Sequence, residues 1–181
     1  MANDLANFAT QECPIRASSL YWMSRCGMHS ALKFLAQFPP DDGGPAAQTG
    51  SLTHLAVEAW HKSNQDEDAA LRELSAALRK FPLADSGEAT KNFAAYAKDP
   101  RNKTAKMIAV EKSIEFSIDP ADNDHTRKPI FIRGTLDQIR EDEEGVYRLY
   151  DLKTGSPEGM AMVHDAALQI SAYCVGATKL F

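Results

Sequence analysis

The chain has 181 residues, of which 44% are apolar and 25% are charged, and its formal net charge at pH 7 is −5. This composition excludes a disordered tail, a collagen-like fibre and a disulfide-rich miniprotein, and the length predicts a single domain over residues 1–181 with a buried core. The acidic balance argues against a protein that coats nucleic acid by bulk charge, but it suits an enzyme with acidic metal ligands. Three cysteines in no zinc-binding pattern, the lack of a long apolar stretch and the lack of a signal-peptide pattern predict a cytoplasmic protein with no membrane partner.

The first hundred residues have helical patterning. Apolar spacing and capping residues predict helices over 16–38, 46–63, 66–81 and 85–98, with a loop over 39–45. The segment 66–81 is the most clearly amphipathic, with acidic residues first and basic residues last. The dipeptide Asp99-Pro100 is expected to end the fourth helix, so that residues 16–100 form a mainly helical part.

From residue 107 onward the pattern is that of a small sheet and a final helix. Strands are expected over 107–118, 129–140 and 146–153, and a helix over 156–181. Residues 141–145 are expected to form a hairpin turn that contains Gly145. This order of elements predicts an α/β fold in which a small, mostly antiparallel sheet is flanked by helices, with 107–181 as the sheet and helix core.

The expected hairpin gathers charged side chains. If Arg140 pairs with Val146, the alternation of strand side chains places Asp137, Asp151 and Lys153 on one face. The opposite face is the expected core side and carries Ile130, Ile132, Gly134, Leu136, Val146, Arg148, Tyr150 and Leu152. Two carboxylates on a diagonal of about 7–8 Å between Cα atoms can share one divalent cation. A surface salt-bridge cluster explains the same residues, so the hairpin alone leaves both interpretations open.

Asp137 followed by Asp151-Leu152-Lys153 resembles the motif order of the PD-(D/E)XK nucleases, whose core is restriction-endonuclease-like. Further segments narrow the resemblance to the RecB-like branch, which includes CRISPR-associated and phage exonucleases. These segments are 17–32, similar to a serine–cysteine helix; 50–60, with Gly-x-x-x-His; 133–139, with Gly-x-hydrophobic-Asp; 150–155, with Asp-x-Lys-Thr-Gly; and 169–173, with Gln-x-x-x-Tyr. Together they extend over most of the chain.

The resemblance implies a role for each matching residue. The implied metal ligands are His54, Asp137, Asp151 and the carbonyl oxygen of Leu152. Lys153 would orient or activate the attacking water, and Glu111 would act from outside the ligand set. Two residues of the last helix would support the site or contact DNA: Gln169 and Tyr173. Without the resemblance, His54 is interpreted as a packed helix histidine, and Gln169 and Tyr173 are interpreted as residues at the boundary of the core.

The cofactor implied by the resemblance is a divalent cation. Oxygen ligands suit Mg²⁺, and one imidazole shifts the preference towards Mn²⁺. Some members of the branch bind an iron–sulfur cluster, of which Cys26 would be the first ligand, but only Cys174 lies late in the chain, so no cluster is expected. If DNA binds, the candidates for phosphate contacts are Lys103, Lys106, Arg127 and Lys128, although most such basic runs are solvated surface.

The pattern as a whole predicts a metal-dependent DNA nuclease, an exonuclease in recombination, repair or phage DNA processing. Two alternatives stay open: a catalytically silent nuclease-like module that binds DNA or a protein partner, and a metal-binding domain with no nucleic-acid role. The family's sheet usually continues after the last helix, whereas this chain ends at Phe181. Either the sheet has one strand fewer, or the N-terminal segment, a second copy or a partner chain covers its edge, or the chain is truncated.

Overall fold

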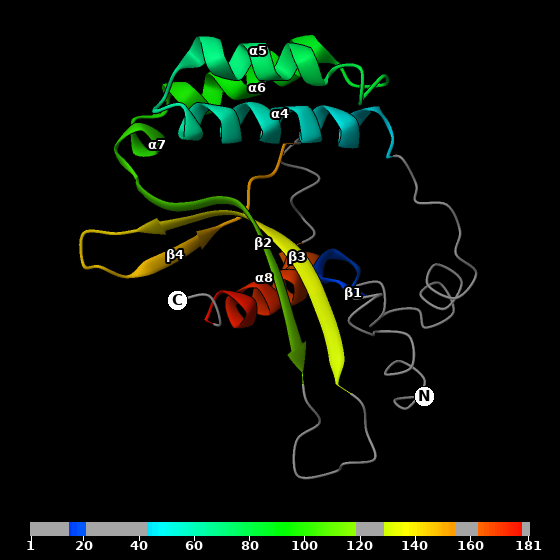
Figure 1. The fold of residues 1–181 in the computed structure, drawn as a ribbon, viewed down its shortest axis with the longest axis vertical. Coiled ribbons are helices and arrows are strands. Elements are labelled where there is room, and N and C mark those ends of the chain that lie inside the picture. The colour runs from blue at the N-terminus through cyan, green and yellow to red at the C-terminus, as the bar shows by residue number, and fades with distance from the viewer. Residues whose placement is uncertain (1–14, 21–42, 119–128, 155–162, 179–181) are drawn as a thin grey trace. The chain divides into compact units, whose positions relative to one another are not determined.

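The computed structural model describes residues 15–20, 43–118, 129–154 and 163–178 (Figure 1). Contacts within the chain divide it into two compact units. Unit 1 contains residues 1–40, 113–135 and 161–181, and unit 2 contains residues 41–112 and 136–160. Strands β2 and β3 each contribute residues to both units, and the two units are described separately below.

Unit 2 begins with helices. They are α4 (Pro45–Lys62), α5 (Glu67–Ala77), α6 (Ser86–Lys98) and the short α7 (Pro100–Thr104). The Asp66 carboxylate accepts hydrogen bonds from the first N–H groups of α5, and the Asp85 carboxylate does the same for α6. These three longer helices confirm the predicted ones, although α5 ends at Ala77 instead of residue 81. Asp99-Pro100 ends α6 as expected, and it also starts α7, for which Asp99 is the N-cap.

The core of unit 2 lies between its helices. Helix α4 packs against both α5 and α6, as Figure 1 shows. The fully buried side chains of this core include Leu52 and Trp60 of α4, Leu74 of α5 and Phe93 of α6. Because one stripe of α4 is held in this core, the neighbouring stripe that carries His54 is left half-buried beside the sheet residues of the same unit.

In the described part of the chain, the sheet has four strands, which are β1 (Ile15–Arg16), β2 (Lys106–Ile118), β3 (Ile130–Glu141) and β4 (Tyr147–Tyr150). The order is β1-β3-β2, and β4 also pairs with β3. In unit 1, β1 runs parallel to β3, with Ile15 opposite Ile132. An N-terminal segment is therefore paired beside β3 at these positions, and the three explanations for the expected open edge stay predictions.

The predicted helix over 16–38 is wrong at its start. Arg16 belongs to β1, and residues Ala17–Ser19 form the 3₁₀ helix η1. Ile15 is buried against the sheet, and the gain from pairing with β3 outweighs the local helical pattern. Residues 21–38 of that predicted helix lie outside the described part of the chain.

The hairpin of β3 and β4 has a different register from the predicted one. Arg140 lies opposite Arg148 instead of Val146, which shifts the pairing by two residues and preserves the faces. The shift arises at the turn, where Asp142 N–H donates to the Val146 carbonyl and Gly145 has φ +78°.

The expected core side of β4 is also wrong. Val146 and Tyr150 are 48% and 42% exposed, and Arg148 is exposed as well. On this face of β3, Leu136 is buried. The next two residues on the same face are polar: Gln138 bonds to a side chain of α6, and Arg140 bonds to a side chain of α7. Polar contacts therefore replace apolar packing at this end of the hairpin.

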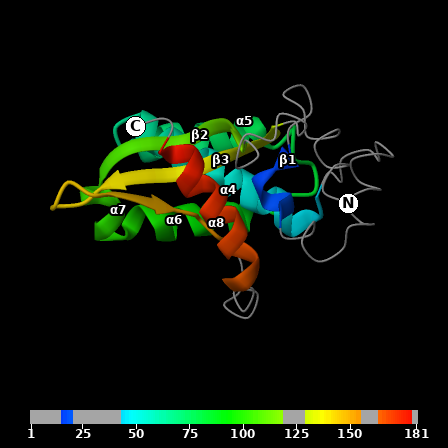
Figure 2. The same ribbon diagram turned by 90° about the horizontal axis from the view of Figure 1, so that it is seen from below.

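Unit 1 contains α8 (Val163–Ala177), which lies within the predicted helix over 156–181; residues 156–162 and 179–181 lie outside the described part. Helix α8 lies against η1 (Figure 2). Gly134 of β3 permits a close approach, because a Cβ atom there would lie 2.5 Å from Cε1 of the buried Tyr173. Among the described residues, no helix combines the length and the apolar character that a membrane span requires.

Candidate metal centre

His54 is the centre of a polar cluster in unit 2. It lies on α4, and its side chain is 24% exposed. Its Nδ1 atom lies 2.8 Å from Glu111 Oε1, and its Nε2 atom lies 3.0 Å from the carbonyl oxygen of Leu152. Both ring nitrogens therefore face oxygen acceptors, which an imidazole satisfies by hydrogen bonding only in its protonated form.

Glu111 reaches this cluster through an unusual backbone conformation. It lies in β2 with φ +46°, in the left-handed region that non-glycine residues rarely adopt. Such a residue interrupts the regular alternation of a strand and redirects its side chain. Backbone strain of this kind is concentrated at functional sites, and here it accompanies the carboxylate that bonds to His54.

Asp137 of β3 completes the cluster. Its side chain is 12% exposed, and its Oδ1 atom lies 3.8 Å from His54 Nδ1. Its Oδ2 atom accepts a hydrogen bond of 2.6 Å from the N–H group of Leu152. Leu152 lies two residues after the end of β4. Its N–H group is bonded to Asp137, and its carbonyl oxygen is bonded to His54.

The three side chains have the chemistry and the spacing of a metal site. His54, Glu111 and Asp137 each offer one ligand atom, and these atoms all lie within 4.8 Å of one another. One imidazole nitrogen and two carboxylate oxygens, with the Leu152 carbonyl beside them, are donors that divalent cations accept in proteins. The residues present therefore fit a divalent cation.

The acidity of the cluster follows from its burial and its charges. Burial raises the pKa of Asp137 to about 6, although the positive charge of His54 and the hydrogen bond from Leu152 oppose this shift. Burial alone would lower the pKa of His54, but the hydrogen bond to Glu111 and the negative charges of Asp137 and Glu111 outweigh it and raise that pKa above 6.5. Without a cation, Asp137 and His54 therefore hold their protons up to a higher pH than the free side chains would, and a divalent cation would compete with these protons.

Asp151 and Lys153 lie on either side of Leu152. They form an ion pair of 2.6 Å, in which the Asp151 side chain is 11% exposed and the Lys153 side chain is 54% exposed. Lys153 lines a cavity of about 590 Å³ together with His54, Glu58 and Glu111. Lys153 therefore lines the same cavity as two residues of the cluster, while the Asp151 carboxylate is bonded to the Lys153 ammonium group instead of to His54.

The remaining predicted site residues belong to unit 1, to other elements of unit 2 or to segments outside the described residues. Gln169 and Tyr173 belong to α8 in unit 1, where Gln169 Nε2 donates to the Tyr173 hydroxyl at 2.8 Å. Lys103 is exposed on α7, and Lys106 is exposed at the start of β2, where it pairs with Glu141. Arg127 and Lys128 lie outside the described residues. The roles of all six in DNA binding or site support stay predictions.

Sequence reasoning placed Glu111 outside the ligand set, whereas the structure places its carboxylate in direct contact with His54. The sequence signal for this position is an acidic residue within an otherwise apolar strand segment, Met107–Val110 followed by Glu111. That signal identifies the residue but not the left-handed backbone that directs it to the cluster.

A comparison with protein families identifies the superfamily that the chain resembles. A family model described as the PD-(D/E)XK nuclease superfamily matches residues 15–181, which is nearly the whole chain. No curated protein matches the chain. The matched superfamily consists of nucleases that use divalent metal ions, and the mixed α/β structure with a small open sheet confirms the predicted restriction-endonuclease-like fold class.

Proposed function

We propose that this chain, which belongs to the PD-(D/E)XK nuclease superfamily, is a metal-dependent deoxyribonuclease of the RecB-like branch. The observation that carries the proposal is the convergence of His54, Glu111 and Asp137, whose ligand atoms lie within 4.8 Å of one another. Family membership supports nuclease activity, and the cluster offers the donor atoms that a divalent cation needs.

The cation would be held by His54, Glu111, Asp137 and the Leu152 carbonyl. When bound, a divalent cation lowers the pKa of a water ligand and neutralises charge on phosphate oxygens. The sequence resemblance also assigns Asp151 to this ion, and in the structure its carboxylate orients Lys153 at 2.6 Å. A set of oxygen donors with one imidazole suits Mg²⁺ or Mn²⁺, and we expect higher activity with Mn²⁺.

Lys153 would supply a positive charge directly to the reacting phosphate. In phosphodiester hydrolysis, the attacking water gives up a proton as its oxygen bonds to phosphorus, the bond from phosphorus to the leaving sugar oxygen breaks, and that leaving oxygen takes up a proton. An ammonium group in the cavity can orient the water and stabilise the negative charge that develops on the phosphate oxygens. Because the Lys153 side chain is 54% exposed, it can contact a strand that enters from solvent.

The finer proposal is an exonuclease that acts in recombination, repair or phage DNA processing. It is supported by the order of the motifs along the chain, from the Gly-x-x-x-His segment at 50–54 to the Gln-x-x-x-Tyr segment at 169–173. An exonuclease requires a free DNA end, so linear DNA should be degraded and covalently closed circular DNA should stay intact.

The test is a cleavage assay on linear duplex, linear single-stranded and closed circular DNA with Mg²⁺ or Mn²⁺. We expect wild type to degrade linear DNA, and Lys153→Ala and Asp137→Ala to lose at least about 100-fold in rate. Lys98→Ala, which removes an exposed lysine of α6, is the matched control and should retain full activity. Binding without cleavage by wild type would show a silent module, and neither binding nor cleavage would show a metal-binding domain without a nucleic-acid role.

A further inference from the structure

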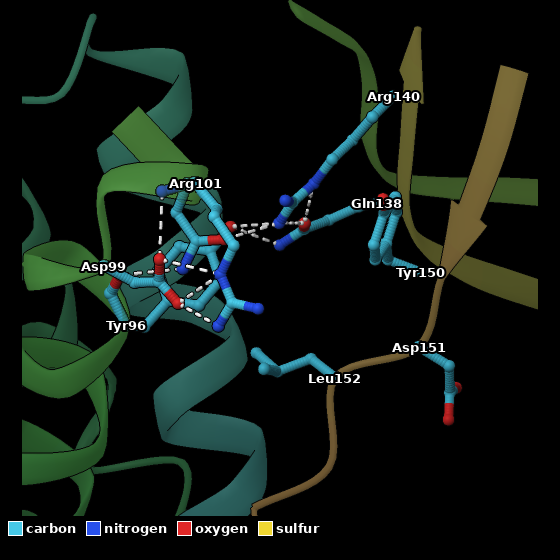
Figure 3. A pocket seen from close by; sticks show the side chains of 9 residues that line it. Tyr96, Asp99, Arg101, Gln138, Arg140, Tyr150, Asp151 and Leu152 are labelled. Carbon is cyan, nitrogen blue, oxygen red and sulfur yellow. Dashed lines mark hydrogen bonds and ion pairs between the residues drawn. The ribbon is translucent and has the colours of Figure 1, made fainter. Parts of the chain in front are cut away.

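A second cavity in unit 2 has a different composition from the metal centre. It has a volume of about 320 Å³ and is lined by residues of α6, α7 and the hairpin, among them Tyr96, Asn102, Gln138, Arg140, Tyr150 and Leu152. Figure 3 shows Arg140, Gln138 and Tyr96 converging in this cavity, whereas the carboxylate of Asp151 points away from them. The residues that line this cavity include two arginines, Arg101 and Arg140.

Arg140 is held in a single orientation by neutral groups. Its Nη2 atom donates to Asn102 Oδ1 at 2.7 Å and to Gln138 Oε1 at 2.5 Å, and its Nε atom donates to the same Gln138 oxygen at 3.0 Å. The guanidinium carbon also lies 4.3 Å from the centre of the Tyr150 ring.

The partners of Arg140 are themselves fixed. Gln138 is 2% exposed, and its Nε2 atom donates to the Tyr96 hydroxyl at 2.7 Å. That hydroxyl donates a hydrogen bond to His61 Nε2 at 2.7 Å, because burial and the charge of Arg140 lower the pKa of His61 to about 4 and keep its ring neutral. Each group therefore has one compatible donor or acceptor role, and the guanidinium is preorganised.

Among the described residues, no carboxylate forms a close ion pair with Arg140, and Asp99, an acidic group of the cavity, acts on it only through longer-range attraction. Asp99 of the same cavity is paired with Arg101 at 2.6 Å, and Asp151 is paired with Lys153 at 2.6 Å. Across the hairpin, Arg140 faces another cation, Arg148, which is itself paired with Asp142. Like charges on opposite strand positions are unfavourable unless an anion lies nearby.

A rigid guanidinium without a close carboxylate partner among the described residues, in a cavity large enough for one nucleotide, fits a phosphate group. The cavity shares Leu152 with the metal centre, where the same residue bonds to both His54 and Asp137. We propose that Arg140 binds the backbone phosphate of a nucleotide adjacent to the scissile bond, and that Asn102, Gln138 and Tyr96 position its guanidinium. The choice of a DNA strand as the ligand rests on the proposed function.

The test is the salt dependence of binding, measured by fluorescence anisotropy with a labelled 12-nucleotide oligothymidine in EDTA, so that no strand is cut. Loss of one phosphate contact to single-stranded DNA lowers the slope of log Kd against log salt by about 0.7. We expect Arg140→Gln to show this lower slope and about tenfold weaker binding at low salt. Arg148→Gln, on the opposite strand, is the matched control and should match wild type, because Asp142 already compensates Arg148.

Two further variants separate phosphate binding from a structural role. Arg140→Lys retains the charge but not the planar fork, so it should restore the slope and only part of the affinity. Asn102→Ala removes one of the groups that hold the guanidinium and should weaken binding without a change in slope. Thermal unfolding of each variant identifies any that lose the fold, and the comparison then rests on those that retain it.

The outcomes for the cavity and for the nuclease are distinguishable. An unchanged slope and affinity in Arg140→Gln would overturn the phosphate site, even if wild type cleaves DNA with Mn²⁺. A lower salt slope and weaker binding in Arg140→Gln, together with no cleavage by wild type under any metal condition, would support the phosphate site and overturn the proposed nuclease activity.

Discussion

The carboxylate of Asp137 is expected to destabilise the metal-free protein at neutral pH. Its side chain is 12% exposed, and burial raises its pKa from the ordinary 3.8 to about 6. Between pH 3.8 and about pH 6, the folded protein therefore binds more protons at this carboxyl group than the unfolded chain does. The free energy of unfolding falls as the pH rises through this window. The difference amounts to about 3 kcal/mol at pH 8.

Asp137→Asn removes this charge and leaves an oxygen that accepts the hydrogen bond from Leu152. We expect the variant to raise the free energy of unfolding of the metal-free protein at pH 8 by at most about 3 kcal/mol. The gain should shrink to less than about 1 kcal/mol at pH 4, because pH 4 is close to the ordinary pKa of 3.8 and the carboxyl group is already protonated in the folded protein. Asp137→Asn also removes the negative charge that attracts His54, whose Nδ1 atom lies 3.8 Å from Asp137 Oδ1. This loss makes the gain in stability smaller than the maximum.

The measurement is urea unfolding in EDTA at pH 4, 6 and 8, followed by the fluorescence of the buried Trp60. Asp142→Asn, on the same hairpin, is a control of opposite sign, because hydrogen bonds from Val146 and Arg148 lower the pKa of that carboxyl group. It should reduce stability at pH 8.

Addition of Mn²⁺ should reverse the order, because wild type binds the ion in the folded state and Asp137→Asn lacks one ligand. A metal-free Asp137→Asn variant that is less stable than wild type at pH 8, or a difference that does not vary with pH, would refute this reasoning.

Three further predictions concern the site and the helices that hold it. Glu111→Gln should raise the Mn²⁺ concentration for half-maximal cleavage about tenfold or more, because the cluster loses one of its two carboxylates, whereas Glu115→Gln on the exposed face of β2 should leave it unchanged. The free energy of unfolding should fall by at most about 2 kcal/mol between pH 7 and pH 5 through His61, because its pKa of about 4 lies below the ordinary 6.5 and only the unfolded chain gains the proton; His61→Gln should lack this part of the pH dependence in urea titrations. Gly50→Ala places a Cβ atom 2.8 Å from Thr154 Oγ1 and should cost about 1–3 kcal/mol in urea unfolding, most of which the additional change Thr154→Ala should restore.

The sequence alone determined the elements of the site and their order. Apolar spacing with Asp66 and Asp85 as caps was enough to locate α5 and α6, because helix formation there depends on residues three or four positions apart. The matching motifs also identified His54 and Asp137, two members of the cluster that the structure brings together.

The tertiary structure decided the features that depend on contacts between distant residues. Glu111 contacts a histidine 57 positions away, and its left-handed backbone has no local sequence signal. The two-residue shift in the hairpin follows from bonds made by Asp142 in the turn, and the β1 strand forms only because β3 lies beside it. The preorganised guanidinium of Arg140 likewise depends on Tyr96 and Asn102, which are 44 and 38 positions away. Local patterns report on neighbours along the chain, whereas charge compensation and ligand geometry depend on groups that only the folded chain brings within hydrogen-bonding distance.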